Sequence, residues 1–275
     1  MEQTITTTAA YKAAEVYERF FVTSIFRYWT PLLLERAAPQ PGERVLDVAC
    51  GTGAVARSIV PLVGPEGKVV GLDINPAMLE VACKQYSDYC EDIDWREGKA
   101  ESLPFSDQDF DLVTCQQGLQ FFKNRPLAAQ EMHRVLRQKG RVVIAVWQSL
   151  DHNPFYRSFY DALASVFNVP MASLAAPYSF GDPGELENLL VEAGFGSVKV
   201  EPVCQDVHFR EADRFVELTI KAASAVIPAF ATLDSRLQVD LVAEVTRRVA
   251  GFIKEHTSDG ILTFPKYANI ATGVC

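Results

Sequence analysis

Residues 45–56, VLDVACGTGAVA, form an apolar run of strand length that passes through a Gly-x-Gly turn into a helical pattern. Gly51 and Gly53 let the chain turn tightly, and they place no Cβ where a ligand must approach the backbone. A strand, a glycine turn and a helix in this order are typical of a nucleotide-binding α/β unit. The spacing Gly51-x-Gly53-x-x-Ala56 also fits a nicotinamide-binding loop or a plain tight turn, so other residues must decide.

Short β-branched runs alternate with helical patterns around this stretch. We expect helices at residues 11–36, 54–62, 76–86, 126–137, 183–193 and within 211–255, and Lys139-Gly140 is typical of a helix end. The alternation predicts a doubly wound, Rossmann-like α/β fold whose seven-stranded sheet is mostly parallel. The expected strands cover residues 44–49, 68–72, 94–97, 110–115, 141–146, 197–203 and 260–274.

The composition narrows the possible partners. The 275 residues carry a formal net charge of −9, which argues against nucleic acid as the main partner. The first residues lack the pattern of a secretory signal, and no apolar run approaches the roughly 18 residues of a membrane-spanning helix. We therefore expect a cytoplasmic protein without stable membrane insertion. The six cysteines show no C-x-x-C pair or zinc-ligand spacing, so we expect reduced thiols and no metal site.

Two carboxylates flank the glycine turn in the predicted sheet. Asp47 lies inside the strand, four residues before Gly51, where it would attract an ammonium group and repel a pyrophosphate. It could also cap local backbone amides. Asp73 ends the next expected strand, twenty residues after Gly53, where a carboxylate can accept both hydroxyls of a ribose. Adenosine and dinucleotide ligands both fit Asp73, so this residue predicts a nucleoside without choosing between them.

A wider resemblance is carried by Asp47-x-x-Cys50-Gly51-Thr52-Gly53, Asp73-x-x-Pro76-x-Met78-Leu79, Ala100-Glu101-x-Leu103-Pro104-Phe105 and Phe110-Asp111. As a set, these segments resemble the class I S-adenosylmethionine-dependent methyltransferases, specifically the group with the ubiquinone/menaquinone C-methyltransferases. The resemblance covers about residues 44–147 and extends more loosely into both flanks. It implies S-adenosylmethionine as cofactor, S-adenosylhomocysteine as its product, and a small molecule as the methyl acceptor.

The resemblance also implies roles for individual residues. Gly51 and Gly53 would lie under the methionine part of the cofactor, and Asp47 would orient its ammonium directly or through water. Asp73 would hold the ribose, with Ile74 against the adenine.

Further contacts to the cofactor follow from the same resemblance. The Ala100 amide would meet the adenine edge, Gln116 would lie near the amino-acid end, and Tyr17 would close over the site. The implied cofactor-binding set is completed by Ala49, Met78, Glu101, Gln117 and Phe121. Family members commonly carry an acidic residue where Lys99 stands, and lysine cannot accept a hydrogen bond from the adenine amino group. Either Glu101 or a backbone carbonyl takes that role, or the cofactor binds less tightly.

The predicted segments are an N-terminal helical segment (1–43), a cofactor-binding α/β core (44–150), a helical cover (151–182), a return to the sheet (183–210), a helical substrate cover (211–259) and a closing strand (260–275).

The methyl acceptor is less constrained than the cofactor. Aromatic residues concentrate between positions 155 and 180, where they either line an apolar pocket or pack between the cover and the sheet. We expect an apolar or aromatic acceptor that is methylated on oxygen or carbon. A general base is needed only if the acceptor loses a proton on the enzyme. His152, just after the fifth expected strand, is the candidate for that catalytic role.

Two other classes of function stay open. A protein of the same fold could bind the cofactor as a sensor or catalyse a reaction other than methylation. A nicotinamide-dependent oxidoreductase is disfavoured by Asp47, by the segment 100–105 and by the lack of a downstream Tyr-x-x-x-Lys pattern.

Overall fold

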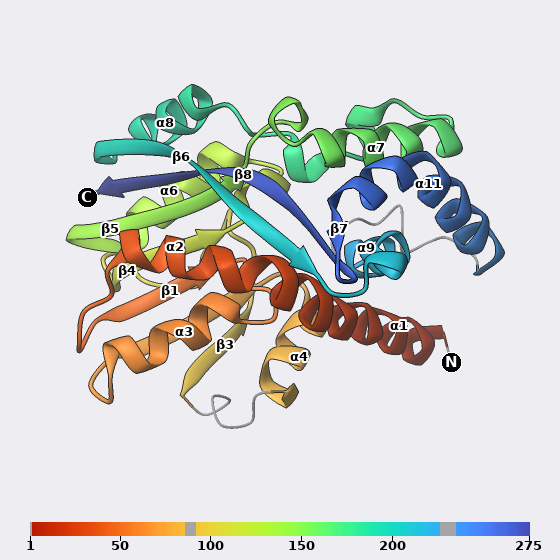
Figure 1. Cartoon of the computed structure of the whole chain (residues 1–275). Helices are drawn as coiled ribbons and strands as arrows, with labels where there is room; N and C mark the ends of the chain where they lie inside the picture. Colours follow the sequence, from red (N-terminus) through yellow and green to blue (C-terminus); the bar gives the residue numbers. More distant parts are fainter. Residues whose placement is uncertain (1, 86–91, 226–234) are drawn as a thin grey trace. The chain divides into compact units, whose positions relative to one another are not determined.

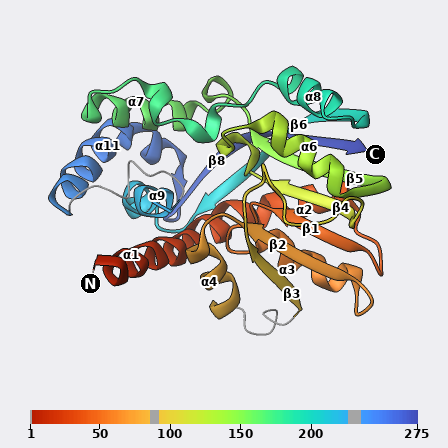
Figure 2. The same cartoon turned by 180° about the vertical axis from the view of Figure 1, so that it is seen from behind.

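The computed structural model describes residues 2–85, 92–225 and 235–275 (Figures 1 and 2). Its contacts divide the chain into two compact units. The sheet unit comprises Trp29–Trp147, Phe180–Val203 and Ala268–Cys275, and the helical unit comprises Met1–Tyr28, Gln148–Ser179 and Cys204–Tyr267. Two long strands, β6 and β8, contribute residues to both units.

The sheet has the strand order β3-β2-β1-β4-β5-β8-β6, with a short β7 paired to β8. Strands β1 to β5 pair in parallel, and β8 runs antiparallel to β5. The strands are β1 Arg44–Val48, β2 Lys68–Asp73, β3 Ile93–Glu97, β4 Phe110–Gln116, β5 Leu136–Trp147, β6 Gly196–Phe209, β7 Thr257–Ser258 and β8 Ile261–Val274. The prediction of a doubly wound, mostly parallel sheet is confirmed, and the two-residue β7 is an addition to it.

Both faces of this sheet are covered by apolar side chains. Leu46 and Val48 of β1 belong to one buried cluster, whereas Val45 belongs to a second cluster with the buried side of α3. Because successive strand residues point to opposite faces, a strand buried on both sides reads as a continuous apolar run.

The helices of the sheet unit are α2 Arg27–Ala37, α3 Ala54–Val63, α4 Pro76–Gln85, α6 Arg125–Val135 and α8 Pro183–Glu192, with the 3-10 turn η2 Leu119–Phe121.

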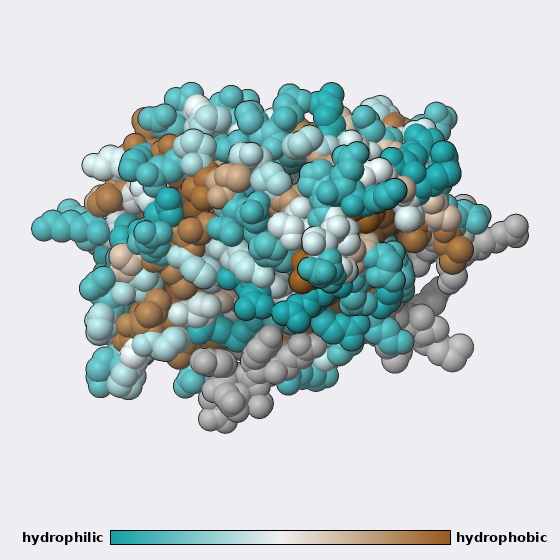
Figure 3. All heavy atoms as spheres, in the orientation of Figure 1, coloured by the Kyte–Doolittle hydropathy of each residue, from teal (hydrophilic) through white to brown (hydrophobic). Residues whose placement is uncertain are grey.

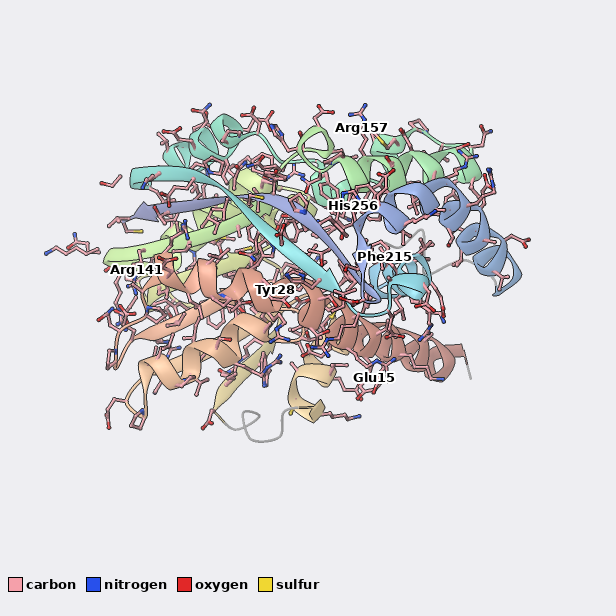
Figure 4. The ribbon with its side chains drawn as sticks, viewed as in Figure 1. Glu15, Tyr28, Arg141, Arg157, Phe215 and His256 are labelled. Carbon is pink, nitrogen blue, oxygen red and sulfur yellow. The ribbon has the colours of Figure 1, made fainter. Side chains whose placement is uncertain are left out.

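An ion pair connects Arg141 in the middle of β5 to Glu43, the residue just before β1. The guanidinium of Arg141, labelled in Figure 4, donates to both carboxylate oxygens of Glu43 at 2.7 and 2.8 Å. It also donates to the backbone oxygen of Ala37 at 2.7 Å. Such a two-pronged contact fixes direction as well as distance, so it positions the chain entering β1.

Two sequence-based expectations are wrong. Lys139-Gly140 does not end a helix, because α6 ends at Val135 and Leu136 already pairs with Phe110 in the sheet. Lys139 takes a φ of 65° within β5, and its amide donates to the oxygen of Cys275. The cysteines are also not all reduced. Cys83 is disulfide-bonded, whereas four described cysteines are free: Cys50, Cys115, Cys204 and Cys275.

The helical unit is held by an aromatic core. The ring of Phe155 lies 5.1 Å from Phe215, 4.6 Å from Phe252 and 4.7 Å from Phe264, measured between centroids. Figure 4 labels Phe215 on α9. The elements are α1 Glu2–Tyr17, the π-helix η1 Glu18–Phe26, η3 Leu150–His152, α7 Pro154–Phe167, η4 Met171–Ser173, η5 Ala176–Tyr178, η6 Ala212–Arg214, α9 Phe215–Ala223 and α11 Ser235–His256. The aromatic residues of segment 155–180 that reach this core are packing residues.

The described part of the chain contains no helix long and apolar enough to cross a membrane. The same residues contain no cluster of three or more His, Cys, Asp or Glu side chains suited to a metal ion. The face drawn in Figure 3 carries mainly hydrophilic residues, with apolar ones scattered among them.

One lysine is buried in the helical unit. Lys266 is 2% exposed, and its Nζ donates to the hydroxyl of Tyr178 at 2.6 Å. The same nitrogen lies 3.7 Å from the ring centroid of Tyr156. Burial lowers the pKa of Lys266 well below its ordinary value of 10.5. The amine therefore makes folding dependent on pH.

We expect the Lys266→Met variant to lose part of that pH dependence. With a lowered pKa, the folded state binds fewer protons than the unfolded state, so stability rises as the pH is raised toward 10.5. The slope for this one group is at most about 1.4 kcal/mol per pH unit. Urea unfolding between about pH 7 and 9 would measure it. The exposed-lysine control Lys254→Met should keep the wild-type slope, and the same slope in Lys266→Met would contradict a lowered pKa.

Candidate functional site

The carboxyl ends of β1, β2 and β4 meet where the strand order of the sheet reverses. Asp47 of β1 pairs with Gly71 of β2 on one side and with Thr114 of β4 on the other. In open α/β sheets this reversal leaves a crevice outside the carboxyl ends of the strands, where ligands bind. The residues predicted from the glycine turn therefore converge on the expected edge.

The turn after β1 depends on residues with positive φ. Ala49, Gly51 and Gly53 have φ values of 56°, 55° and 85°. The Gly53 amide donates to the Cys50 oxygen at 2.8 Å, and Gly53 then caps the first turn of α3. This conformation keeps the backbone of the turn close to the sheet edge, as the sequence predicts.

Trp95 is a residue of the site that the sequence analysis missed. It pairs with Gly71 across β2 and β3, and because Gly71 has no side chain the indole can lie over β2. A Cβ added at Gly71 would lie 2.6 Å from the indole, and one added at Gly53 would lie 2.3 Å from it. In the sequence, Trp95 is simply a tryptophan within a short expected strand. Its contact with the turn follows from the register of β2 and β3, which places it opposite Gly71.

Asp47 is buried and only partly satisfied. It is 1% exposed, and its Oδ1 accepts a hydrogen bond from the Thr114 hydroxyl at 2.8 Å. Its Oδ2 is buried and has no hydrogen-bond partner among the residues that the structure describes. Burial raises the pKa of Asp47 from 3.8 to about 7, and the Thr114 hydroxyl and the nearby Ala56 amide partly offset this effect. A cationic group on the ligand would supply the missing partner.

Asp73 connects β2 to the turn after β1. Its Oδ2 accepts from the Gly51 amide and its Oδ1 from the Asn75 amide, each at 2.8 Å. Burial raises the pKa of Asp73 above its ordinary value. A carboxylate has about four lone-pair sites, so both oxygens retain capacity for hydroxyl donors. Ile74 follows directly and is 62% exposed, which leaves a large apolar surface beside the carboxylate.

Met78, Ala100, Glu101 and Phe121, which are also predicted at this edge, differ in how far they are buried. Met78 and Ala100 are buried, and Phe121 in η2 is 37% exposed. Glu101 Oε1 accepts from the amides of Lys123 and Asn124 at 3.1 and 3.4 Å, which positions the loop before α6.

Three glutamines lie where β4 ends, and all belong to the sheet unit. Gln116 is the last residue of β4, Gln117 has a φ of 57°, and Gln120 lies in η2. The Gln117 amide donates to the Ala145 oxygen at 2.8 Å, so β5 fixes the start of this turn. Gln120 was not predicted as a site residue.

Tyr17 and His152 belong to the helical unit. The Tyr17 ring lies 5.6 Å from Phe21 and 5.8 Å from Phe26. His152 is exposed in η3, with its Nδ1 3.4 Å from the Ser149 hydroxyl. The other predicted site residues belong to the sheet unit, which brings the two carboxylates and the glycine turn together.

Comparison with known proteins identifies a family. The sequence profile of the ubiE/COQ5 methyltransferase family matches residues 11–209. The chain is 38% identical over 154 residues to a ubiquinone/menaquinone biosynthesis C-methyltransferase of Hahella chejuensis, covering 55% of this chain and 61% of that protein. It is 33% identical over 189 residues to the protein of the same name from Ectopseudomonas mendocina, covering 63% and 73%.

Solved structures share the fold at lower identity. A phosphoethanolamine N-methyltransferase 2 of Haemonchus contortus, in complex with S-adenosyl-L-methionine, superposes with a TM-score of 0.58 at 18% identity. That comparison covers 95% of this chain and 56% of the other. The [4+2]-cyclase SpnF superposes with a TM-score of 0.54 at 20% identity, covering 89% and 79%. The Rossmann-like fold and the predicted class of S-adenosylmethionine-dependent methyltransferases are thus confirmed, and the chain belongs to the ubiE/COQ5 methyltransferase family.

Proposed function

We propose that the chain transfers a methyl group from S-adenosylmethionine to an oxygen or activated carbon of a small apolar or aromatic molecule. The observation that carries this proposal is the buried Asp47 carboxylate beside the turn formed by Gly51 and Gly53. Its Oδ2 lacks a partner within the described ranges, so the ammonium of the cofactor fits there. A dinucleotide would instead bring a pyrophosphate toward the same carboxylate. When bound, S-adenosylmethionine supplies an electrophilic methyl group on its sulfonium.

The protein contributes by positioning the reactants and excluding water. Asp47 holds the ammonium, the glycine turn lies under the methionine chain, and Asp73 accepts the ribose hydroxyls. Ile74 packs on the adenine through its exposed side chain. Methyl transfer requires the nucleophile, the methyl carbon and the sulfur in line at near-contact distance, which fixed contacts of this kind favour.

The acceptor class is supported by composition and by the names of the relatives. Both relatives described above are named as C-methyltransferases of ubiquinone and menaquinone biosynthesis, so a quinone-type acceptor fits this chain as well. Phe121 borders the cofactor in this proposal, whereas the role expected of Tyr17, which belongs to the helical unit, stays a prediction. His152, exposed in η3, is the candidate base for an acceptor that must lose a proton.

The cofactor assignment can be tested by thermal unfolding. At about a hundredfold excess over the dissociation constant, a ligand of the folded state adds roughly 2.7 kcal/mol. We expect S-adenosylmethionine and S-adenosylhomocysteine to raise the melting temperature by roughly 5–10 °C, and NAD to leave it unchanged. Asp47→Asn should abolish the shift, whereas the exposed control Asp161→Asn should keep it. A shift with NAD alone would overturn the proposal.

The ionisation of Asp47 predicts a pH dependence of cofactor binding. Because its pKa is about 7 in the free protein, the carboxylate must lose a proton before it can pair with the ammonium. The dissociation constant of S-adenosylhomocysteine should therefore rise roughly tenfold per pH unit below about pH 7. Methylthioadenosine, which has no amino-acid portion, should show no such slope. Isothermal titration at several pH values would measure both, and parallel slopes would exclude Asp47 as the cause.

The same raised pKa predicts the stability of Asp47→Asn. Between the unfolded pKa of 3.8 and the folded pKa of about 7, the folded protein binds more protons than the unfolded chain. The contribution of Asp47 to the free energy of unfolding is therefore present at low pH and is lost as the pH rises from about 4 to about 7. At neutral pH the ionised carboxylate destabilises the ligand-free fold by at most about 4 kcal/mol. We expect Asp47→Asn to be the more stable protein at pH 8 in urea unfolding, and a less stable variant would contradict this account.

A further inference from the structure

Thr114 of β4 lies directly beside Asp47 in the sheet. The two residues are partners in the parallel pairing of β1 with β4, and both are buried, with Thr114 0% and Asp47 1% exposed. The Thr114 hydroxyl donates to Oδ1 of Asp47 at 2.8 Å. On its other side Asp47 pairs with Gly71 of β2, which has no side chain. Among the residues that the structure describes, β4 therefore supplies the one side-chain donor to this carboxylate.

The other groups near Asp47 leave this hydroxyl as the side chain that favours its ionised form. Burial raises the pKa of Asp47 to about 7, and the like charge of Asp73 on β2 adds to the rise. The Thr114 hydroxyl lowers the pKa, because it donates a hydrogen bond to the ionised carboxylate. Two nearby thiols are neutral near pH 7, since burial raises the pKa of Cys115 to about 12 and that of Cys50 above its ordinary value.

The α3 side of Asp47 contributes a backbone donor. The Ala56 amide in the first turn of α3 also lowers the pKa of Asp47, although the Thr114 hydroxyl has the larger effect. The guanidinium of Arg57, the next residue of α3, donates to the backbone oxygen of Thr52. The charge on Asp47 therefore depends on hydrogen-bond donors, and the Thr114 hydroxyl is the one that a side-chain substitution can remove.

The direction of this hydrogen bond decides which oxygen of Asp47 carries a proton. Oδ1 accepts from Thr114, and within the described residues the hydroxyl donates to no other acceptor. A neutral Asp47 that keeps this hydrogen bond must hold its proton on Oδ2, the oxygen without a partner in the described part of the chain. Because the pKa is about 7, roughly half of the ligand-free protein has this neutral form at neutral pH.

A ligand on the glycine turn brings its charge close to that proton. Ala49 and Gly51 keep accessible surface, whereas Asp47 is almost fully enclosed. An ammonium group held over the turn attracts the ionised carboxylate strongly, directly or through a water, because the apolar surroundings screen charges weakly. It gains nothing comparable from the neutral acid, so binding favours the form that has lost the proton.

We propose that Thr114 is the positioning residue of the ammonium site: it holds Oδ1 of Asp47, leaves the proton on Oδ2 in the free protein, and favours its release when the cofactor binds. The Oδ2–H bond breaks, the proton passes to the solvent, and the ammonium keeps its own protons. This inference rests on the proposed function, because it requires the cofactor ammonium beside Asp47. It adds to that function a residue of β4 and a proton release coupled to cofactor binding.

Replacing the hydroxyl with a methyl group tests this role. Thr114→Val removes the donor, which should raise the midpoint of the pH dependence of S-adenosylhomocysteine binding by about one to two pH units. The dissociation constant should then be about tenfold higher than that of wild type at pH 7, and within about threefold of it at pH 9. Thr114→Ser keeps the hydroxyl and should restore the wild-type profile. Isothermal titration between about pH 6 and 9 would measure these constants.

Two controls separate the ionisation of Asp47 from the packing of β4. Methylthioadenosine has no amino-acid portion, so its affinity should be the same in Thr114→Val and wild type at every pH. Thr272→Val makes the same substitution on β8, where Thr272 pairs with Val143, the partner of Thr114 on β5. This variant should match wild type with both ligands.

Proton release can be measured directly by titrating S-adenosylhomocysteine in phosphate and in Tris, whose ionisation enthalpies differ. At pH 7 the wild type should release about half a proton per ligand bound, and Thr114→Val about 0.9.

Urea unfolding gives a readout that needs no ligand. A higher folded pKa of Asp47 extends the range over which its ionisation destabilises the fold, so in Thr114→Val the fall in the free energy of unfolding should continue about one pH unit higher than in wild type. Thr114→Ala, which removes the donor without adding a methyl group, replaces Thr114→Val in all three measurements if the latter does not fold.

The outcomes separate this role from its alternatives. Coincident pH profiles of S-adenosylhomocysteine binding in Thr114→Val and wild type would overturn the inference and leave the cofactor assignment intact. Equal weakening of S-adenosylhomocysteine and methylthioadenosine at every pH would show that Thr114 packs the strands without setting the charge of Asp47, which also overturns it. Failure of the wild type to bind either ligand at any pH would mean that the proposed function itself fails.

Discussion

A carboxylate buried within a parallel sheet constrains the rest of this site. Asp47 lies in β1, which is paired with β2 on one side and β4 on the other. The Thr114 hydroxyl is 2.8 Å from one of its oxygens, and its neighbours in the chain, Leu46 and Val48, are apolar. Its pKa of about 7 expresses the desolvation that the fold imposes on the charged form. The apolar sheet stabilises the fold by burial on both faces, and this allows one strand position to remain unfavourable until a cation is bound.

The surrounding turn is fixed by contacts that also serve the strands. Asp73 ends β2 and binds the Gly51 amide, so the second strand sets the shape of the turn that follows the first. Trp95 crosses Gly71 to reach Gly53, so the third strand packs on the same turn. The rigidity of the cofactor turn is therefore a property of three strands in register, which is what positioning a methyl group requires.

The two compact units use buried polar groups in different ways. In the sheet unit, the Oδ2 atom of Asp47 is buried without a hydrogen-bond partner among the residues that are described. In the helical unit, the amine of Lys266 is enclosed by tyrosine hydroxyl and ring contacts, and its burial lowers its pKa. The first arrangement favours a ligand, whereas the second links the stability of the aromatic core to pH.

The sequence alone determined the parallel sheet, the glycine turn, the two carboxylates and the family. These features are local or periodic: apolar runs of strand length, glycines at fixed spacing and acids at strand ends can be read without knowing which strands pair. Only the tertiary structure decided that Lys139 and Gly140 extend β5, because that depends on pairing with the carboxyl-terminal strand β8 and its neighbour Cys275. It also decided that Trp95 packs on Gly53 and which amide atoms of Gln116 and Gln117 stay unpaired. Strand register and side-chain hydrogen bonds join residues far apart in the chain, and no local pattern encodes those distances.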